Sequence, residues 1–170
     1  IAGKTKLSID FSGGISTQNN LEITFNSGAT FASIGSIAVK DEFTFTGWLL
    51  AYGADKFIIG ADVKEEQILI KGWTESTSLT VFELIDKYKL KGVKQFFCTD
   101  ISKDGLLEGP SVDLYNKIIN EHPSIDLIAS GGVSTIKDLE ELREVGCSGA
   151  IIGKAIYENK ILLTDLKKFL

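Results

Sequence analysis

Short apolar runs alternate along this chain with segments that have helical periodicity. The apolar runs start near residues 6, 31, 56, 95, 125 and 149, and a periodic segment follows each of them. In residues 136–145, for example, apolar side chains recur every three residues at Ile136, Leu139, Leu142 and Val145, which is typical of a helix with one buried face. Six strand–helix units in alternation predict an α/β fold with a parallel sheet.

The pattern also sets expected element limits. Strands are expected at residues 6–11, 31–37, 56–62, 94–100, 125–129 and 150–152, and helices at residues 18–26, 42–52, 79–90, 110–120, 136–145 and 162–170. Residues 67–73 are expected to form an extra strand in a hairpin, because no helix separates them from the strand before. Residues 101–110 contain two glycines and a proline and are expected to form a long loop.

One stretch of the sequence occurs twice. The segment SGGIST starts at Ser12, and SGGVST starts at Ser130, 118 residues further on. An ungapped comparison of residues 12–35 with residues 130–153 contains 11 identities in 24 positions. This period is far longer than the roughly 20–50 residues of solenoid repeats. Two such halves approach the ~250 residues of a (β/α)8 barrel, so the repeat predicts a duplicated half-barrel.

Both copies place paired glycines between a strand and a helix. The pairs are Gly13-Gly14 and Gly131-Gly132, and Gly153-Lys154 ends the last strand. Main-chain N–H groups can approach an anion closely at such turns, and the start of a helix adds its positive end. Two copies favour a substrate with a phosphate at each end. The alternative is that both pairs are tight connections that bind nothing.

Composition narrows the class of protein. The chain has 170 residues, of which 44% are hydrophobic and 24% charged, which indicates one globular domain over residues 1–170. A net charge of −5 argues against nucleic acid and anionic membranes as partners. The sequence has no run of membrane-span length, no signal-peptide pattern and no metal-ligand spacing around Cys98 and Cys147. We therefore expect a reduced, cytoplasmic protein.

The first residues indicate that the chain is part of a longer one. It begins with Ile1 and contains no methionine. Six strand–helix units are two short of a barrel, and the repeat assigns them as units three to eight. The expected fold is therefore a partial TIM barrel. Such a sheet would expose unpaired edges, so self-association of the chain is expected.

Candidate catalytic residues end two of the expected strands, where barrel active sites lie. Asp62 follows an apolar run, and an apolar setting favours the protonated carboxyl group that a general acid needs. Asp62 could instead cap the next turn. Thr99 could bind the substrate or the acid, while Asp100 could equally hold the loop that follows. Trp73 could stack on a flat heterocycle or simply pack against its hairpin.

Several segments together resemble the histidine-biosynthesis isomerases that act on phosphoribosylformimino-aminoimidazole-carboxamide ribotide. The resembling segments, which together with their surroundings span essentially the whole chain, are residues 60–62, 71–73, 98–105, 129–134 and 153–158. The sister cyclase of the same pathway shares the fold and both phosphate turns. The Lys71-Gly72-Trp73 hairpin and Gly153-Lys154-Ala155 favour the isomerase over the cyclase.

The resemblance implies an Amadori rearrangement of a bisphosphate aminoaldose to an aminoketose, without a metal or an organic cofactor. It implies that Asp62 is the general acid, that Thr99 supports it and that Trp73 contacts the heterocyclic end of the substrate. The residues matched to one phosphate site are Gly131, Gly132, Gly153 and Lys154, and those matched to the other are Gly13, Gly14 and Ser36.

Two departures from the family pattern affect these expectations. The family's general base, an aspartate at the end of the first barrel strand, has no counterpart in this chain, so the chain alone is expected to be inactive. Ser12 and Ser16 replace a glycine and a basic residue that are common in the family, which predicts a weaker first phosphate site. A non-catalytic bisphosphate-binding or assembly fragment is the competing interpretation.

Overall fold

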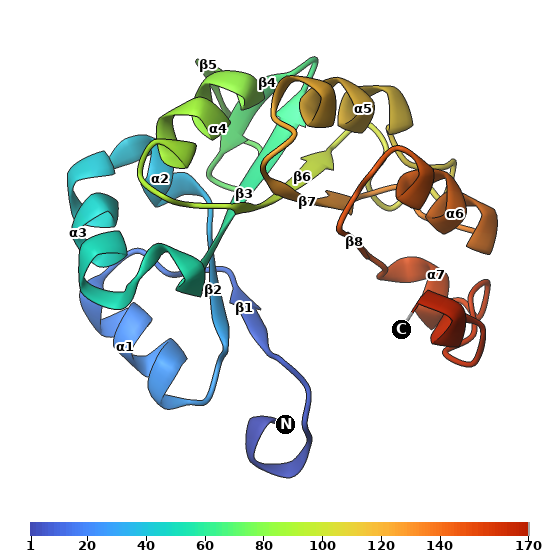
Figure 1. Cartoon of the computed structure of the whole chain (residues 1–170), viewed down its shortest axis with the longest axis horizontal. Helices are drawn as coiled ribbons and strands as arrows, with labels where there is room; N and C mark the ends of the chain where they lie inside the picture. The colour runs from blue at the N-terminus through green and yellow to red at the C-terminus, as the bar shows by residue number, and fades with distance from the viewer. Residues whose placement is uncertain (170) are drawn as a thin grey trace.

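A curled sheet with helices along its outer face forms the protein. The structure is a computed structural model that describes residues 1–169 (Figure 1). Six parallel strands lie in the order β1 (Asp10–Ser12), β2 (Phe31–Ile34), β3 (Phe57–Lys64), β6 (Gln95–Asp100), β7 (Asp126–Ser130) and β8 (Gly149–Ile151). The sheet remains open between β1 and β8, so the predicted α/β class and partial barrel are confirmed.

The helices between the parallel strands lie on the convex side of the sheet, and one further short helix follows β8 (Figure 1). They are α1 (Gln18–Asn26), α2 (Ser36–Lys40), α3 (Glu42–Tyr52), α4 (Val81–Lys89), α5 (Val112–Glu121), α6 (Ile136–Glu144) and α7 (Lys154–Tyr157), with 3₁₀ turns at Ala2–Lys4, Ala54–Lys56 and Asp165–Phe169. An antiparallel hairpin of β4 (Gln67–Ile70) and β5 (Glu75–Thr80) extends the carboxyl end of β3.

Successive side chains of β3 point alternately into the core and toward the concave face of the sheet. Phe57 is fully buried and meets Phe45 of α3 with ring centroids 5.5 Å apart, so this side of the strand faces the helices. The alternate residues, which include Gly60 and Asp62, face the concave side. Phe97 of β6 fills the space beside Gly60, since a Cβ atom built there would lie 2.3 Å from its ring. A side chain at position 60 would therefore require the Phe97 ring to move.

Threonine caps explain where two helices of the repeat begin. Thr17 accepts a hydrogen bond from the N–H of Asn20 at the start of α1. Thr135 and Asp138 form a reciprocal capping box at the start of α6. A cap of this kind satisfies N–H groups that have no partner inside the helix and contributes about 1 kcal/mol. Both copies thus start their helices with a threonine cap, and only the second adds the reciprocal carboxylate.

Several expected limits were wrong. The first strand begins only at Asp10, where its partner β2 starts, and β2 ends at Ile34 because Gly35 turns the chain into α2. Residues 71–74 form a turn instead of continuing the extra strand, and α4 begins at Val81 because residues 75–80 pair with β4 as β5. Helices α2 and α7 were missed because they are too short to show periodicity.

The expected helix over residues 162–170 is also wrong. In the described residues this segment forms only a 3₁₀ turn at Asp165–Phe169, and Leu170 lies outside them. A segment this short has little helical stability of its own. It is held instead by contact, because Leu166 and Phe169 line an apolar cavity of about 370 Å³ with Leu139 of α6 and Cys147.

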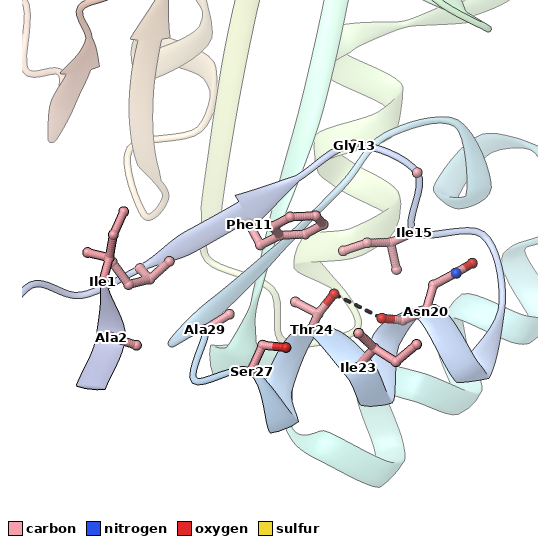
Figure 2. Close-up of a pocket in the computed structure, with 12 residues that line it drawn as sticks. Ile1, Ala2, Phe11, Gly13, Ile15, Asn20, Ile23, Thr24, Ser27 and Ala29 are labelled. Carbon is pink, nitrogen blue, oxygen red and sulfur yellow. Dashed lines mark hydrogen bonds between the residues drawn. The ribbon is translucent and has the colours of Figure 1, made fainter. Parts of the chain in front are cut away.

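The other edge of the sheet has a matching apolar cavity. It has a volume of about 380 Å³ and lies between β1, α1 and the first residues of the chain (Figure 2). Phe11, Ile15 and Ile23 point into it, and Phe11 and Ile23 are about half exposed. Among residues 1–169, no helix is long and apolar enough to cross a membrane.

Candidate active site

Three side chains with oxygen atoms lie next to each other where the central strands end. Asp62 on β3 is paired with Thr99 on β6, and Thr99 is paired with Ser130 on β7. Ile151 on β8 completes the row. The structure thus brings the predicted Asp62 and Thr99 together on the concave face. Ser130 was missed, although its position directly before a glycine pair could have indicated it.

The carboxylate of Asp62 is held by the hairpin. Its Oδ2 accepts a hydrogen bond from the indole Nε1–H of Trp73 at 2.9 Å. Asp62 is only partly buried, so the burial expected from its apolar run is incomplete. The difference arises because the strand ends at an open cavity. Trp73 is 43% exposed, so its indole is not part of the hydrophobic core.

Thr99 and Asp100 have separate surroundings although they are adjacent. Thr99 is 5% exposed and faces the concave side. Asp100 accepts hydrogen bonds from Ser102 Oγ at 2.7 Å and from Ser111 Oγ at 2.5 Å. Burial acts to raise the pKa of Asp100, but these hydrogen bonds outweigh it and hold the pKa below its usual range. Asp100 therefore anchors the loop over residues 101–111, one of the two alternatives left open by the sequence.

The first glycine turn and Asp62 line one cavity of about 340 Å³. Gly13, Gly14 and Ser36, all expected at one phosphate site, are among its lining residues. The hairpin forms another wall, where the N–H of Lys71 donates to Ser36 Oγ at 3.2 Å. The acid candidate thus faces the same cavity as the first turn.

The second glycine turn lines its own cavity of about 230 Å³. All four residues expected there, Gly131, Gly132, Gly153 and Lys154, are in its wall. The Lys154 ammonium donates to the backbone oxygen of Gly105 at 2.9 Å, so it is directed toward the loop over residues 101–111. That loop forms part of the wall. Sequence reasoning identified it as a loop but not as part of this site.

Backbone contact fixes the second turn against this loop. The N–H of Gly109 donates to the oxygen of Gly132 at 3.1 Å. Gly132 has a φ of +80°, and a Cβ atom there would lie 2.2 Å from the Gly109 oxygen. A side chain at position 132 is therefore excluded both by conformation and by space.

One further carboxyl group on the concave face was not predicted. Asp10 lies at the start of β1, and its Oδ2 accepts a hydrogen bond from Ser33 Oγ at 2.7 Å. Burial raises the pKa of Asp10, and the Ser33 hydrogen bond opposes the shift only in part. Ser33 is paired with Ile58, which precedes Asp62 by four residues, so Asp10 lies toward the opposite end of the strands. Within residues 1–169, no cluster of three histidine, cysteine or acidic side chains could hold a metal ion.

Known proteins are similar in sequence to this chain over its whole length. The isomerase of Flavobacterium psychrophilum, named for 1-(5-phosphoribosyl)-5-((5-phosphoribosylamino)methylideneamino)imidazole-4-carboxamide, is 49% identical over all 170 residues, which span 70% of its length. Isomerases of the same name from Parabacteroides distasonis and Azobacteroides pseudotrichonymphae are each 50% identical over 169 residues, or 99% of this chain and 71% and 70% of theirs. The family described as histidine biosynthesis protein matches residues 1–162. The chain belongs to the histidine biosynthesis protein family.

Proposed function

We propose that this chain forms the acid-bearing part of the active site of an aldose–ketose isomerase of histidine biosynthesis. The observation that carries the proposal is the placement of two glycine turns in separate cavities, with Asp62 in one and Ser130 in the other. The relatives are named for a compound with two phosphoribosyl groups. A molecule with two phosphates at its ends suits two such turns.

Asp62 is the proposed general acid. It gives a proton to the ring oxygen of the aminoaldose, the bond from C1 to that oxygen breaks, and the nitrogen lone pair forms a C=N bond to C1. Removal of the C2 proton by a base then gives an enolamine, which becomes the aminoketose. Thr99, next to Asp62, is placed to donate a hydrogen bond to the substrate or to the acid. Every atom of the substrate remains in the product.

No second carboxylate accompanies Asp62 in its row. The other members of this row in the described structure are Thr99, Ser130 and Ile151, none of which is a general base. Asp10 lies toward the other end of the strands. We therefore expect residues 1–170 alone to bind substrate without turning it over. We place the reaction in the cytoplasm, because the buried free thiol of Cys98 suits a reducing compartment.

A chimera tests the function directly. Residues 1–170 would replace the matching segment of the Flavobacterium psychrophilum isomerase, and turnover of the substrate would be compared with that of the isolated chain. We expect activity from the chimera, and Asp62→Asn should reduce its kcat by roughly 10²–10⁴-fold with little change in substrate affinity. The variant Asp113→Asn, on the exposed surface of α5, serves as the matched control.

Two results would contradict the proposal. An inactive but folded chimera would contradict the isomerase assignment. An Asp62→Asn chimera that keeps more than about a tenth of the parent kcat would remove Asp62 from the role of acid. Substantial turnover by the isolated chain would place a base within residues 1–170.

We also propose that the isolated chain associates with itself through its two sheet edges. Phe11 at one edge and Ile151 at the other are each nearly half exposed, and both edges have apolar cavities beside them. Unpaired strands with apolar surroundings are sites of edge-to-edge association. Light scattering across a dilution series should show a mass that exceeds the monomer, and Phe11→Lys should lower it. A strictly monomeric chain would contradict this proposal.

A further inference from the structure

The contact between Trp73 and Asp62 has a direction that bears on proton transfer. An indole nitrogen can donate a hydrogen bond but cannot accept one. Because Trp73 Nε1–H points at Asp62 Oδ2, at 2.9 Å, this oxygen has to present a lone pair. We propose that Trp73 is a positioning residue that confines the transferable proton of Asp62 to Oδ1. This inference rests on the proposed role of Asp62 as general acid.

The hairpin is built to deliver the indole to this position. Register pairs Asp62 with Leu69, so the turn that follows β4 comes back beside the end of β3. Lys71, Gly72 and Trp73 have φ values of +54°, +62° and +70°. Two of these residues are not glycine, and each left-handed conformation of this kind costs about 1–2 kcal/mol. The turn keeps this conformation because contacts along it hold it in place.

Two contacts besides the indole hold the turn. The N–H of Lys71 donates to Ser36 Oγ at 3.2 Å, and the Lys71 ammonium lies 2.7 Å from Glu75 at the start of β5. Trp73 is therefore not a free side chain on a flexible loop. Its N–H is aimed at Asp62 by a turn that is fixed on both sides.

The arrangement assists the ring-opening step. Oδ1 gives its proton to the ring oxygen, the bond from C1 to that oxygen breaks, and Asp62 is left as a carboxylate. The negative charge then develops on a group that already has a donor at Oδ2. A hydrogen bond to an ionised acceptor is stronger than one to a neutral acceptor, so the Trp73 N–H stabilises the product of the transfer more than its reactant.

The contact itself can be tested on the 170-residue chain by nuclear magnetic resonance. The chain has two tryptophans, so an amide correlation spectrum contains two indole N–H signals. Asp62→Leu should move the Trp73 signal and speed its exchange with water, whereas Asp62→Asn, which keeps an acceptor oxygen, should leave it near its original place. The buried Trp48 indole provides the internal control. A Trp73 signal indifferent to Asp62→Leu would overturn the proposal.

The catalytic role of Trp73 can be separated from its packing by the replacement of a single group in its ring. Replacement of Trp73 by benzothienylalanine, in which sulfur takes the place of the N–H, keeps the shape of the ring and removes the donor. In the active chimera this should lower kcat by roughly 10- to 100-fold, which is the value of a hydrogen bond to a charged group, and leave KM unchanged. Trp73→Ala should raise KM as well.

The outcomes distinguish this inference from the proposed function. An unchanged kcat with benzothienylalanine would overturn the positioning role. An inactive parent chimera would instead overturn the isomerase assignment, and the indole signal would still decide whether Trp73 holds Asp62.

Discussion

The two glycine turns have nearly the same sequence but very different support. At Gly13 and Gly14, an added Cβ atom would meet nothing within 4 Å. At Gly132 it would strike the backbone of Gly109 at 2.2 Å. The first turn follows the edge strand β1. The second follows the interior strand β7 and contacts the loop over residues 101–111. A duplicated motif can therefore keep its backbone conformation while its neighbours decide how closely it is packed.

The second turn also has a positively charged side chain beside it, which the first turn lacks at the equivalent position. Lys154 follows the Gly153 turn of the second copy, and Ser36 occupies the equivalent place in the first. The caps differ as well, because Asn20 stands where the second copy has Asp138. The second site thus has a cation and a carboxylate close to the turn, and the first has neutral groups only at these positions.

Alanine substitutions should give the largest difference in unfolding free energy between the two turns. Gly14→Ala should cost about 1–2 kcal/mol of unfolding free energy, because the residue has a φ of +74° but open space around it. Gly132→Ala should cost about 2–5 kcal/mol, because overpacking against Gly109 adds to the same conformational strain. Urea denaturation of both variants measures the difference. Equal losses would mean that the loop over residues 101–111 yields easily and does not support the turn.

Phosphate titration should distinguish the two sites by their charge. Lys154→Ala should weaken inorganic phosphate at the second turn by roughly tenfold, since the lysine supplies the local positive charge. Ser36→Ala should weaken the first site by only a few-fold, because it removes one neutral hydroxyl group. Binding followed by calorimetry and by residue-specific amide shifts assigns each loss to its turn. A protein with a single phosphate site would contradict the argument for a two-ended substrate.

A fall in pH should weaken the contribution of Asp100 to stability and strengthen that of Asp10. The pKa of Asp100 is lowered in the fold, so its stabilisation is present above the unfolded-state pKa and is lost as the pH falls through the folded-state pKa. The pKa of Asp10 is raised, so its contribution is present below the unfolded-state pKa and is lost as the pH rises through the folded-state pKa.

Two amide variants measure these contributions. Asp100→Asn should destabilise the protein at neutral pH, by no more than about 1 kcal/mol because solvent screens a partly exposed group. Asp10→Asn should stabilise it at neutral pH. Both differences should shrink across the acid range, as the pH falls through the folded-state pKa of each carboxyl group, which lies below the ordinary aspartate value for Asp100 and above it for Asp10. Denaturation midpoints across this range decide the point, and differences that are constant with pH would exclude titration as the cause.

The caps should give the smallest effect. Asp138 Oδ2 accepts hydrogen bonds from the N–H groups of Ser134 and Thr135, at 2.7 and 2.9 Å, close to the second turn. Asp138→Asn should strengthen phosphate binding there, by up to about 1 kcal/mol, because a negative charge leaves the helix start. Asn20→Asp should weaken the first site by a similar amount. Affinities that do not change in either variant would show that the caps lie too far from the bound anion.

The sequence predicted the elements that depend on local pattern and missed those that depend on neighbours. Alternation and glycine pairs located the sheet and both turns, and the apolar run before Asp62 indicated a strand end facing a site. Nothing local could show that Trp73 returns to Asp62, because this requires the register of the hairpin. Nor could spacing show the contact of Gly109 with Gly132, which joins two distant loops.

Gly60 and Phe97 have a consequence for how this sheet can change over evolution. The ring of Phe97 occupies the place of the side chain that Gly60 lacks. A larger residue at position 60 would require the Phe97 ring to move or position 97 to become smaller, and a smaller residue at 97 would widen the cavity that Phe97 lines. Each single step crosses a less stable intermediate. The two positions are expected to be inherited as a pair, and the strand that ends in Asp62 keeps its alignment with the strand that ends in Thr99 as long as that pair persists.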